Sequence, residues 1–182
     1  MEMARENASM NHQQVDLKSW AKTGLIGGFI AAITFALFEM IVALILVDDF
    51  FSPLRMIGAI VLGPQALTLQ IPLTTIIWTG TSIHIAYSLI TGAIFASIIS
   101  KFSFLRSTPA IIIGAGSAYG FLMWIINFYI IAPAAGWIWF PEQANQFWQG
   151  FVAHTFLFGA VLGWYVAKRK LHRISRERPS NT

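Results

Sequence analysis

The sequence predicts an all-α polytopic membrane protein with four transmembrane helices in a bundle. Only 11% of the 182 residues are charged and 56% are hydrophobic, whereas a typical soluble domain is about 25% charged. Four apolar segments each reach the roughly 20 residues that a spanning helix needs. Eleven of the twelve Lys and Arg residues fall in the N-terminal segment, the central connection or the C-terminal tail. Because positive charge marks cytoplasmic segments, both termini are predicted to be cytoplasmic.

The chain divides into three parts. We expect a disordered cytoplasmic tail over 1–19, a four-helix transmembrane domain over 20–168 and a basic cytoplasmic tail over 169–182. The predicted spans cover about 23–47, 73–100, 109–131 and 146–167. Pro109 is expected at the first position of the third helix, where proline is favoured. Residues 53–62 are too few to cross a bilayer, so they predict an interfacial or partly re-entrant half-helix.

Small residues recur every four positions in several of these segments. Gly80, Ser88, Gly92 and Ala96 form one such stripe, and His84 is in phase with it. The first span has a similar stripe, and the fourth contains a GxxxG pair. Stripes of this kind mark the faces on which membrane helices pack together. His84 is therefore predicted to face protein and not lipid.

The order of segments suggests an internal repeat. Each half of the chain has a span, a long outer connection and a second span that carries a histidine. Duplication of a two-helix unit would produce this plan, and repeats are common in membrane transporters. Bilayer constraints alone could also produce two similar hairpins, so both explanations stay open.

Each span places one polar side chain in the outer half of the bundle. These side chains are Glu39, His84, Asn127 and His154. At about 1.5 Å per residue, Glu39, His84 and His154 lie roughly 12–16 Å below the outer boundary. A charged carboxylate at that depth costs about 2.5–3.5 kcal/mol or more, so Glu39 needs a partner. An imidazole or Asn127 is the expected partner.

This polar group has several possible roles. His84, His154 and Glu39 together could hold a transition metal, since imidazole and carboxylate ligands suit such ions. The two histidines could ligate haem b, with Glu39 and Asn127 completing a cofactor site. A Glu–His pair could also bind a quinone or pass protons. Alternatively, the four side chains only hydrogen-bond one another and fix the helix register.

Other features set limits on function. The absence of cysteine excludes disulfides, thiolate metal sites and thiol chemistry. No basic patch on a soluble domain indicates nucleic acid. Arg55 is the one outward cation. It could anchor the outer connection by pairing with Asp48, Asp49 or Glu142, or with a lipid phosphate, or it could be a plain interfacial arginine without a specific partner. The aromatic residues Trp137, Trp139, Phe140 and Trp148 fit an interfacial belt or the roof of a ligand pocket.

Four short stretches resemble uncharacterised four-helix bacterial inner-membrane proteins. They are FSPLRMIGAIVLGPQA (51–66), NFYIIAP (127–133), WFPE (139–142) and AHTF (153–156). The resemblance covers most of residues 22–167. It implies a multi-pass protein of the bacterial inner membrane, and it brings no catalytic residue with it.

Three functions compete at this point. The first is an accessory or structural subunit of a larger membrane complex, with membrane lipids and other subunits, or a second copy of the chain, as partners. The second is a membrane redox protein that holds haem or a metal through its His/His/Glu group. The third is a small proton or solute transporter. No signature in the sequence indicates an enzyme.

Overall fold

The computed structural model describes residues 16–142 and 147–177, and within them every regular element is helical. Residues 1–15 of the tail predicted over 1–19 therefore lie outside the described residues, as do residues 178–182. The elements that make up the four long helices are α2 (Leu17–Val47), α4 (Leu73–Lys101), α5 (Pro109–Ile126), α8 (Phe147–Val152) and α9 (Val161–Glu177). The short helices are α3 (Ser52–Leu62), η1 (Pro64–Leu67), η2 (Phe104–Arg106), α6 (Ala132–Ala134) and α7 (Trp139–Glu142). Two π-helical segments, η3 (Asn127–Ile131) and η5 (Ala153–Ala160), continue α5 and α8 respectively.

Within the described residues, four continuous helices are long and apolar enough to cross a membrane. They run over Leu17–Val47, Leu73–Lys101, Pro109–Ala134 and Phe147–Arg169. Much of their apolar surface is exposed in the folded chain: Ile45 is 74% exposed and Trp78 is 76% exposed. Such surface suits lipid as the surrounding solvent. The prediction of an all-helical chain with four segments able to span a membrane is confirmed.

Local sequence signals set the helix ends. The Asp16 side chain accepts a hydrogen bond from the Ser19 backbone N–H at 3.0 Å and caps α2. Asp48 ends α2 in the left-handed region with a φ of 53°, which aspartate tolerates better than most residues. Thr108 caps α5 through the Ile111 N–H, and Pro109 opens that helix as predicted.

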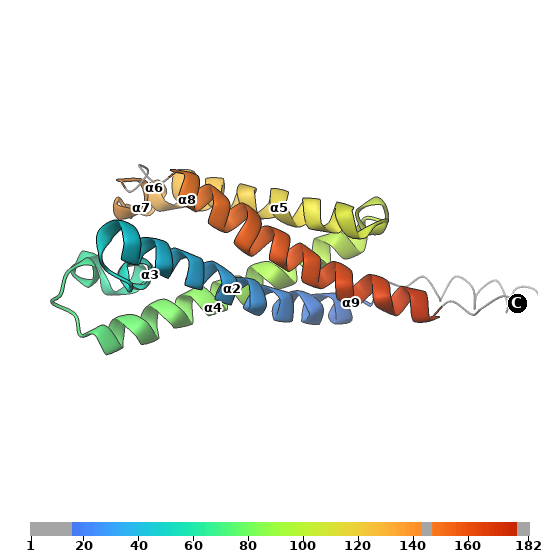
Figure 1. The fold of residues 1–182 in the computed structure, drawn as a ribbon, viewed down its shortest axis with the longest axis horizontal. Coiled ribbons are helices and arrows are strands. Elements are labelled where there is room, and N and C mark those ends of the chain that lie inside the picture. Colours follow the sequence, from blue (N-terminus) through green and yellow to red (C-terminus); the bar gives the residue numbers. More distant parts are fainter. Residues whose placement is uncertain (1–15, 143–146, 178–182) are drawn as a thin grey trace, which may run out of the picture.

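The long helices associate as two close pairs, α2 with α4 and α5 with η5 and α9 (Figure 1). In the first pair, a Cβ atom on Gly24 or Gly92 would collide with the backbone carbonyl of the other. In the second pair, the same holds for Gly116 and Gly159. Backbones therefore touch without intervening side chains at both crossings, as small-residue stripes allow. The stripes predicted from sequence meet each other inside this one chain.

Neighbouring long helices alternate in direction, so α2 begins and α9 ends at the same end of the molecule (Figure 1). A main apolar cluster joins the two pairs through Phe95, Ile99, Ile112 and Leu162. A second cluster at the opposite end joins α3 and η1 to α4 through Leu54, Ala66 and Ile76, with Trp139 packed among them. Helices α3, η1 and α7 therefore cover one end of the four long ones.

Candidate functional site

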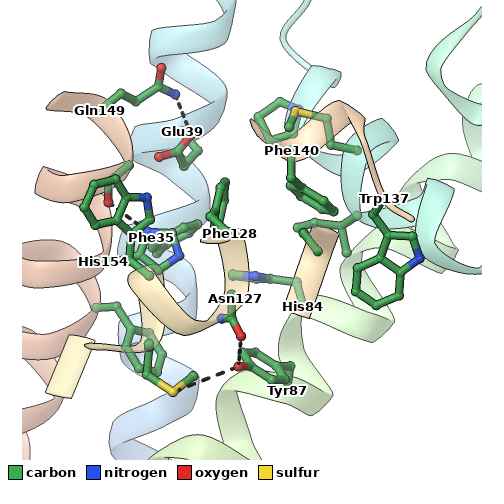
Figure 2. A pocket seen from close by; sticks show the side chains of 18 of the residues that line it. Phe35, Glu39, His84, Tyr87, Asn127, Phe128, Trp137, Phe140, Gln149 and His154 are labelled. Atoms are coloured by element: carbon green, nitrogen blue, oxygen red, sulfur yellow. Dashed lines mark hydrogen bonds between the residues drawn. The ribbon is translucent and has the colours of Figure 1, made fainter. Parts of the chain in front are cut away.

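A cavity of about 390 Å³ lies between the two helix pairs, at the end covered by α3. Residues of α2, α3 and α4 line one part, and residues of α5, η3, α8 and η5 line the rest. All four side chains of the predicted polar group, Glu39, His84, Asn127 and His154, are in its lining (Figure 2). The structure thus gathers them around one space, although they do not all touch one another.

Glu39 of α2 has a partner that differs from the one expected. Its Oε2 atom accepts a hydrogen bond from the Gln149 side-chain N–H of α8 at 2.5 Å (Figure 2). Within the described residues, neither histidine nor Asn127 is hydrogen-bonded to Glu39, so the expected partner was wrong. Gln149 is only 5% exposed, and its Oε1 atom is buried with no partner in the described part of the chain.

His84 faces protein, as its stripe predicts. Its Nε2 atom lies 3.0 Å from the backbone carbonyl oxygen of Ala32, on α2. The neighbouring stripe residues Ser88 and Gly92 lie against the backbone of Gly28. This close approach of α4 to α2 lets the imidazole reach a carbonyl of the facing helix.

His154 lies in the π-helical segment η5, where the helix is locally wider than an α-helix. Its Nδ1 atom is 2.8 Å from the Gly150 carbonyl oxygen, one turn earlier. Its backbone carbonyl is packed so closely against Gly120 that a Cβ there would collide with it. Single π-turns often occur at functional sites, and this one sets the direction of a cavity-lining histidine.

Phe35 packs against both imidazoles. Its ring centroid is 5.4 Å from that of His84 and 4.7 Å from that of His154. No group of three or more His, Cys, Asp or Glu side chains in residues 16–142 and 147–177 is placed to hold a metal ion. His84, His154 and Glu39 therefore share a cavity without forming a compact ligand set, and a metal or haem there stays a prediction.

Asn127 opens the second π-helical segment, η3, and pairs with α4. Its Oδ1 atom accepts a hydrogen bond of 2.8 Å from the Tyr87 hydroxyl (Figure 2). This bond uses one of the two lone pairs of the amide oxygen and leaves the NH₂ group available to donate. Both π-helical segments thus carry a member of the predicted polar group.

The aromatic residues predicted as a belt or a pocket roof have different surroundings. Trp137 and Phe140 line the cavity. The Trp139 indole N–H donates to the Met56 carbonyl oxygen at 3.1 Å and ties α7 to α3. Trp148 is 51% exposed and does not line the cavity.

Arg55 is 8% exposed and holds together the connection between α2 and α4. Its Nε–H donates to Asp49 Oδ2 at 3.0 Å, and Nη1 donates to the Thr68 carbonyl oxygen at 3.1 Å. Of the carboxylates expected as partners, the structure selects Asp49. Arg55 therefore fixes α3 between the end of α2 and the segment that follows η1.

We expect Arg55→Gln to loosen this connection. Hydrogen bonds of charged groups contribute about 1.5–3 kcal/mol each, and the shorter amide cannot reach both partners. Amide hydrogen exchange over residues 49–68 should accelerate by roughly tenfold or more, since about 1.4 kcal/mol corresponds to tenfold. Lys101→Gln, at an exposed position at the end of α4, serves as the control, and equal exchange in both variants would contradict the anchoring role.

Sequence reasoning missed Gln149, Tyr87 and Phe35. A carboxylate at the depth of Glu39 needs a partner, and the sequence contains a candidate in Gln149, five residues before His154. A five-residue spacing is out of phase in an α-helix, and Gln149 lies on the α-helical α8, before the π-helical segment η5 begins at Ala153. Tyr87 and Phe35 look like ordinary lipid-facing or core aromatics, and no sequence signal distinguishes them.

Comparison of the chain with protein-family models, with curated proteins and with solved structures finds no match.

Proposed function

We propose that this protein is a multi-pass membrane protein that binds a small, mainly apolar molecule with one polar group. The observation that carries the proposal is the cavity itself, which is lined mainly by apolar and aromatic side chains together with Glu39, His84, Asn127 and His154. Small-molecule sites are typically cavities of about 300–1,000 Å³ with an apolar lining and a few placed polar groups.

The free energies of hydrogen bonding and of placing a carboxylate in the membrane disfavour a purely structural role for Glu39 and Gln149. An interhelical hydrogen bond in a membrane contributes about 0.6 kcal/mol on average and at most about 1.7. A carboxylate near the centre of a spanning helix costs about 2.5–3.5 kcal/mol. A pair of apolar side chains at positions 39 and 149 would therefore hold the two facing helices together at a lower cost in free energy. Retaining a carboxylate there makes sense if it serves a ligand.

The distribution of Lys and Arg supports an orientation of the chain in the membrane, and the resemblance to bacterial inner-membrane proteins supports a choice of membrane. With both termini cytoplasmic, the α3 end and its cavity face away from the cytoplasm. The bacterial inner membrane is the membrane that the resemblance implies. Each helix pair crosses at a close contact between two glycines. Duplication of a helical hairpin would leave this shared feature in both halves of the chain.

The accessory-subunit function has lost the feature that motivated it. A small-residue face could pack against a partner subunit, but the faces at the two helix crossings are occupied by contacts within the chain, such as Gly24 with Gly92. A haem or metal bound by both histidines would compete with Phe35, which packs on both rings. Transport of a solute is compatible with a binding cavity of this kind, and binding is the step that all solute transport requires.

Filling the cavity tests the proposal. Ile83 lines the cavity on α4, whereas Ile90 on the same helix is 59% exposed and does not. We expect Ile83→Trp to abolish binding of naphthalene-sized apolar probes, measured by calorimetry in detergent, and to remove any small molecule that co-purifies with the wild type. Ile90→Trp should bind as the wild type does. Equal binding by both variants, or none by the wild type, would contradict a ligand site here.

A further inference from the structure

The hydrogen bonds of the two histidines assign their ring nitrogens. A backbone carbonyl only accepts, so His84 Nε2 must carry a proton toward Ala32, and His154 Nδ1 must carry one toward Gly150. In each neutral imidazole the other nitrogen is then an acceptor. His84 Nδ1 and His154 Nε2 make no hydrogen bond within the described residues. Both cavity-lining histidines thus offer lone pairs.

The Glu39–Gln149 pair adds further acceptors. Gln149 donates its N–H to Glu39, and its buried oxygen has no partner among the described residues. A carboxylate has two oxygens with about four acceptor sites, and only one bond to Glu39 is present in the described structure. Glu39, His84 and His154, which keep free acceptor atoms, are called the acceptor wall below. These residues come from α2, α4 and η5.

The rest of the lining offers few fixed donors. These are the Asn127 amide and the indole N–H groups of Trp124 and Trp137. The hydroxyl groups in the lining can donate or accept, so they set no preference. Among the described residues that line the cavity, Glu39 is the one acidic side chain and there is no Lys or Arg. Glu39 therefore has no counter-ion from the described lining.

Aromatic rings complete the surroundings. Phe35, Phe128, Phe140 and Trp137 line the same cavity as the acceptor wall, and Figure 2 shows Phe35 and Phe128 beside the polar side chains. The centroid of the Phe128 ring lies 5.5 Å from that of the His154 ring and 5.3 Å from that of the Phe140 ring. The faces of such rings attract cations.

We propose that the molecule bound in this cavity is a lipophilic amine in its protonated, cationic form. The inference rests on the proposed function and specifies its ligand. An ammonium group only donates hydrogen bonds, which matches the free acceptor atoms of Glu39, His84 and His154. Its charge supplies the counter-ion that Glu39 lacks, and its apolar body suits the aromatic lining. A carboxylate ligand would meet the negative Glu39 and the acceptor wall, which disfavour it.

Three probes that share one ring system test this ligand class. They are 2-naphthylmethylammonium, 2-naphthylmethanol and 2-naphthoate, titrated by calorimetry into the full-length protein in a neutral detergent. We expect the ammonium to bind at least tenfold more tightly than the alcohol, and the naphthoate to bind more weakly than either. Glu39→Gln should weaken ammonium binding at least tenfold and leave alcohol binding within about twofold. Asp48→Asn makes the same change outside the cavity and should bind like the wild type.

The outcomes separate the two proposals. If the alcohol or the naphthoate binds as tightly as the ammonium, the cavity is a ligand site but the cationic class is wrong. If Glu39→Gln binds the ammonium like the wild type, the role of Glu39 as counter-ion is overturned. If none of the three probes binds, the proposed function fails and this inference fails with it. Circular dichroism of each variant shows that a loss of binding is not a loss of fold.

Discussion

Gly116→Ala should lower the free energy of unfolding by about 3 kcal/mol, at the upper end of the usual cost of overpacking. A Cβ on Gly116 would collide with the Gly159 carbonyl oxygen and come within 3.0 Å of Gly163 Cα. These neighbours are backbone atoms, so no change of rotamer relieves the collision. The helix pair α5/η5–α9 would have to separate. Unfolding of detergent-solubilised protein by SDS, followed by circular dichroism, measures the change.

Gly114→Ala is the matched control. Gly114 lies on the same helix but is exposed, and a Cβ there would meet nothing within 4 Å. Because alanine favours a helix over glycine by about 1 kcal/mol, this variant should be as stable as the wild type or slightly more stable. If both alanine variants had the same stability, the close crossing of these helices would be wrong.

The double variant Glu39→Met/Gln149→Met should be more stable than the wild type and should no longer bind the ammonium probe. Replacing the carboxylate removes a cost of about 2.5–3.5 kcal/mol. Losing the hydrogen bond gives up about 0.6–1.7 kcal/mol. The difference is a gain of roughly 1–3 kcal/mol in the free energy of unfolding. The same SDS titration and the calorimetric titration measure the two effects.

The single variant Gln149→Met completes this comparison. It leaves Glu39 buried without its partner, so it should be less stable than the double variant. A double variant that is less stable than the wild type by about 1 kcal/mol or more would show that the pair serves helix packing. Gain of stability together with loss of binding is the pattern expected of a functional site, because such sites trade stability for activity.

The sequence was sufficient to predict the helices. Apolar length predicts four spanning segments, and Pro109 and Asp48 predict where two helices begin or end. These signals are local, so they are readable without knowledge of the fold. The stripes of small residues also predict which faces pack. They do not say whether the facing surface belongs to the same chain, and the structure shows that Gly24 and Gly116 both pack within it.

The candidate site was predictable only in part. Depth along each span predicts that Glu39, His84, Asn127 and His154 come to one level, and all four line the cavity. Pairing within that level depends on how each helix is rotated about its axis. The two π-helical segments, η3 and η5, have wider turns at Asn127 and His154, so ideal α-helical spacing does not predict the rotation of these residues. Glu39 is paired instead with Gln149, on the α-helical turn before η5.

Photolabelling tests the central claim most directly, because it reports where a ligand lies. A naphthylmethylamine that carries a diazirine would be bound to the wild-type protein in detergent, activated by light, and located by mass spectrometry of peptides. We predict that the label concentrates on cavity-lining residues of α2, α4 and η3, such as Phe35, His84 and Phe128, and that excess unlabelled 2-naphthylmethylammonium displaces it. Labelling confined to lipid-facing positions such as Ile45 and Trp78, without competition, would contradict a ligand site in this cavity.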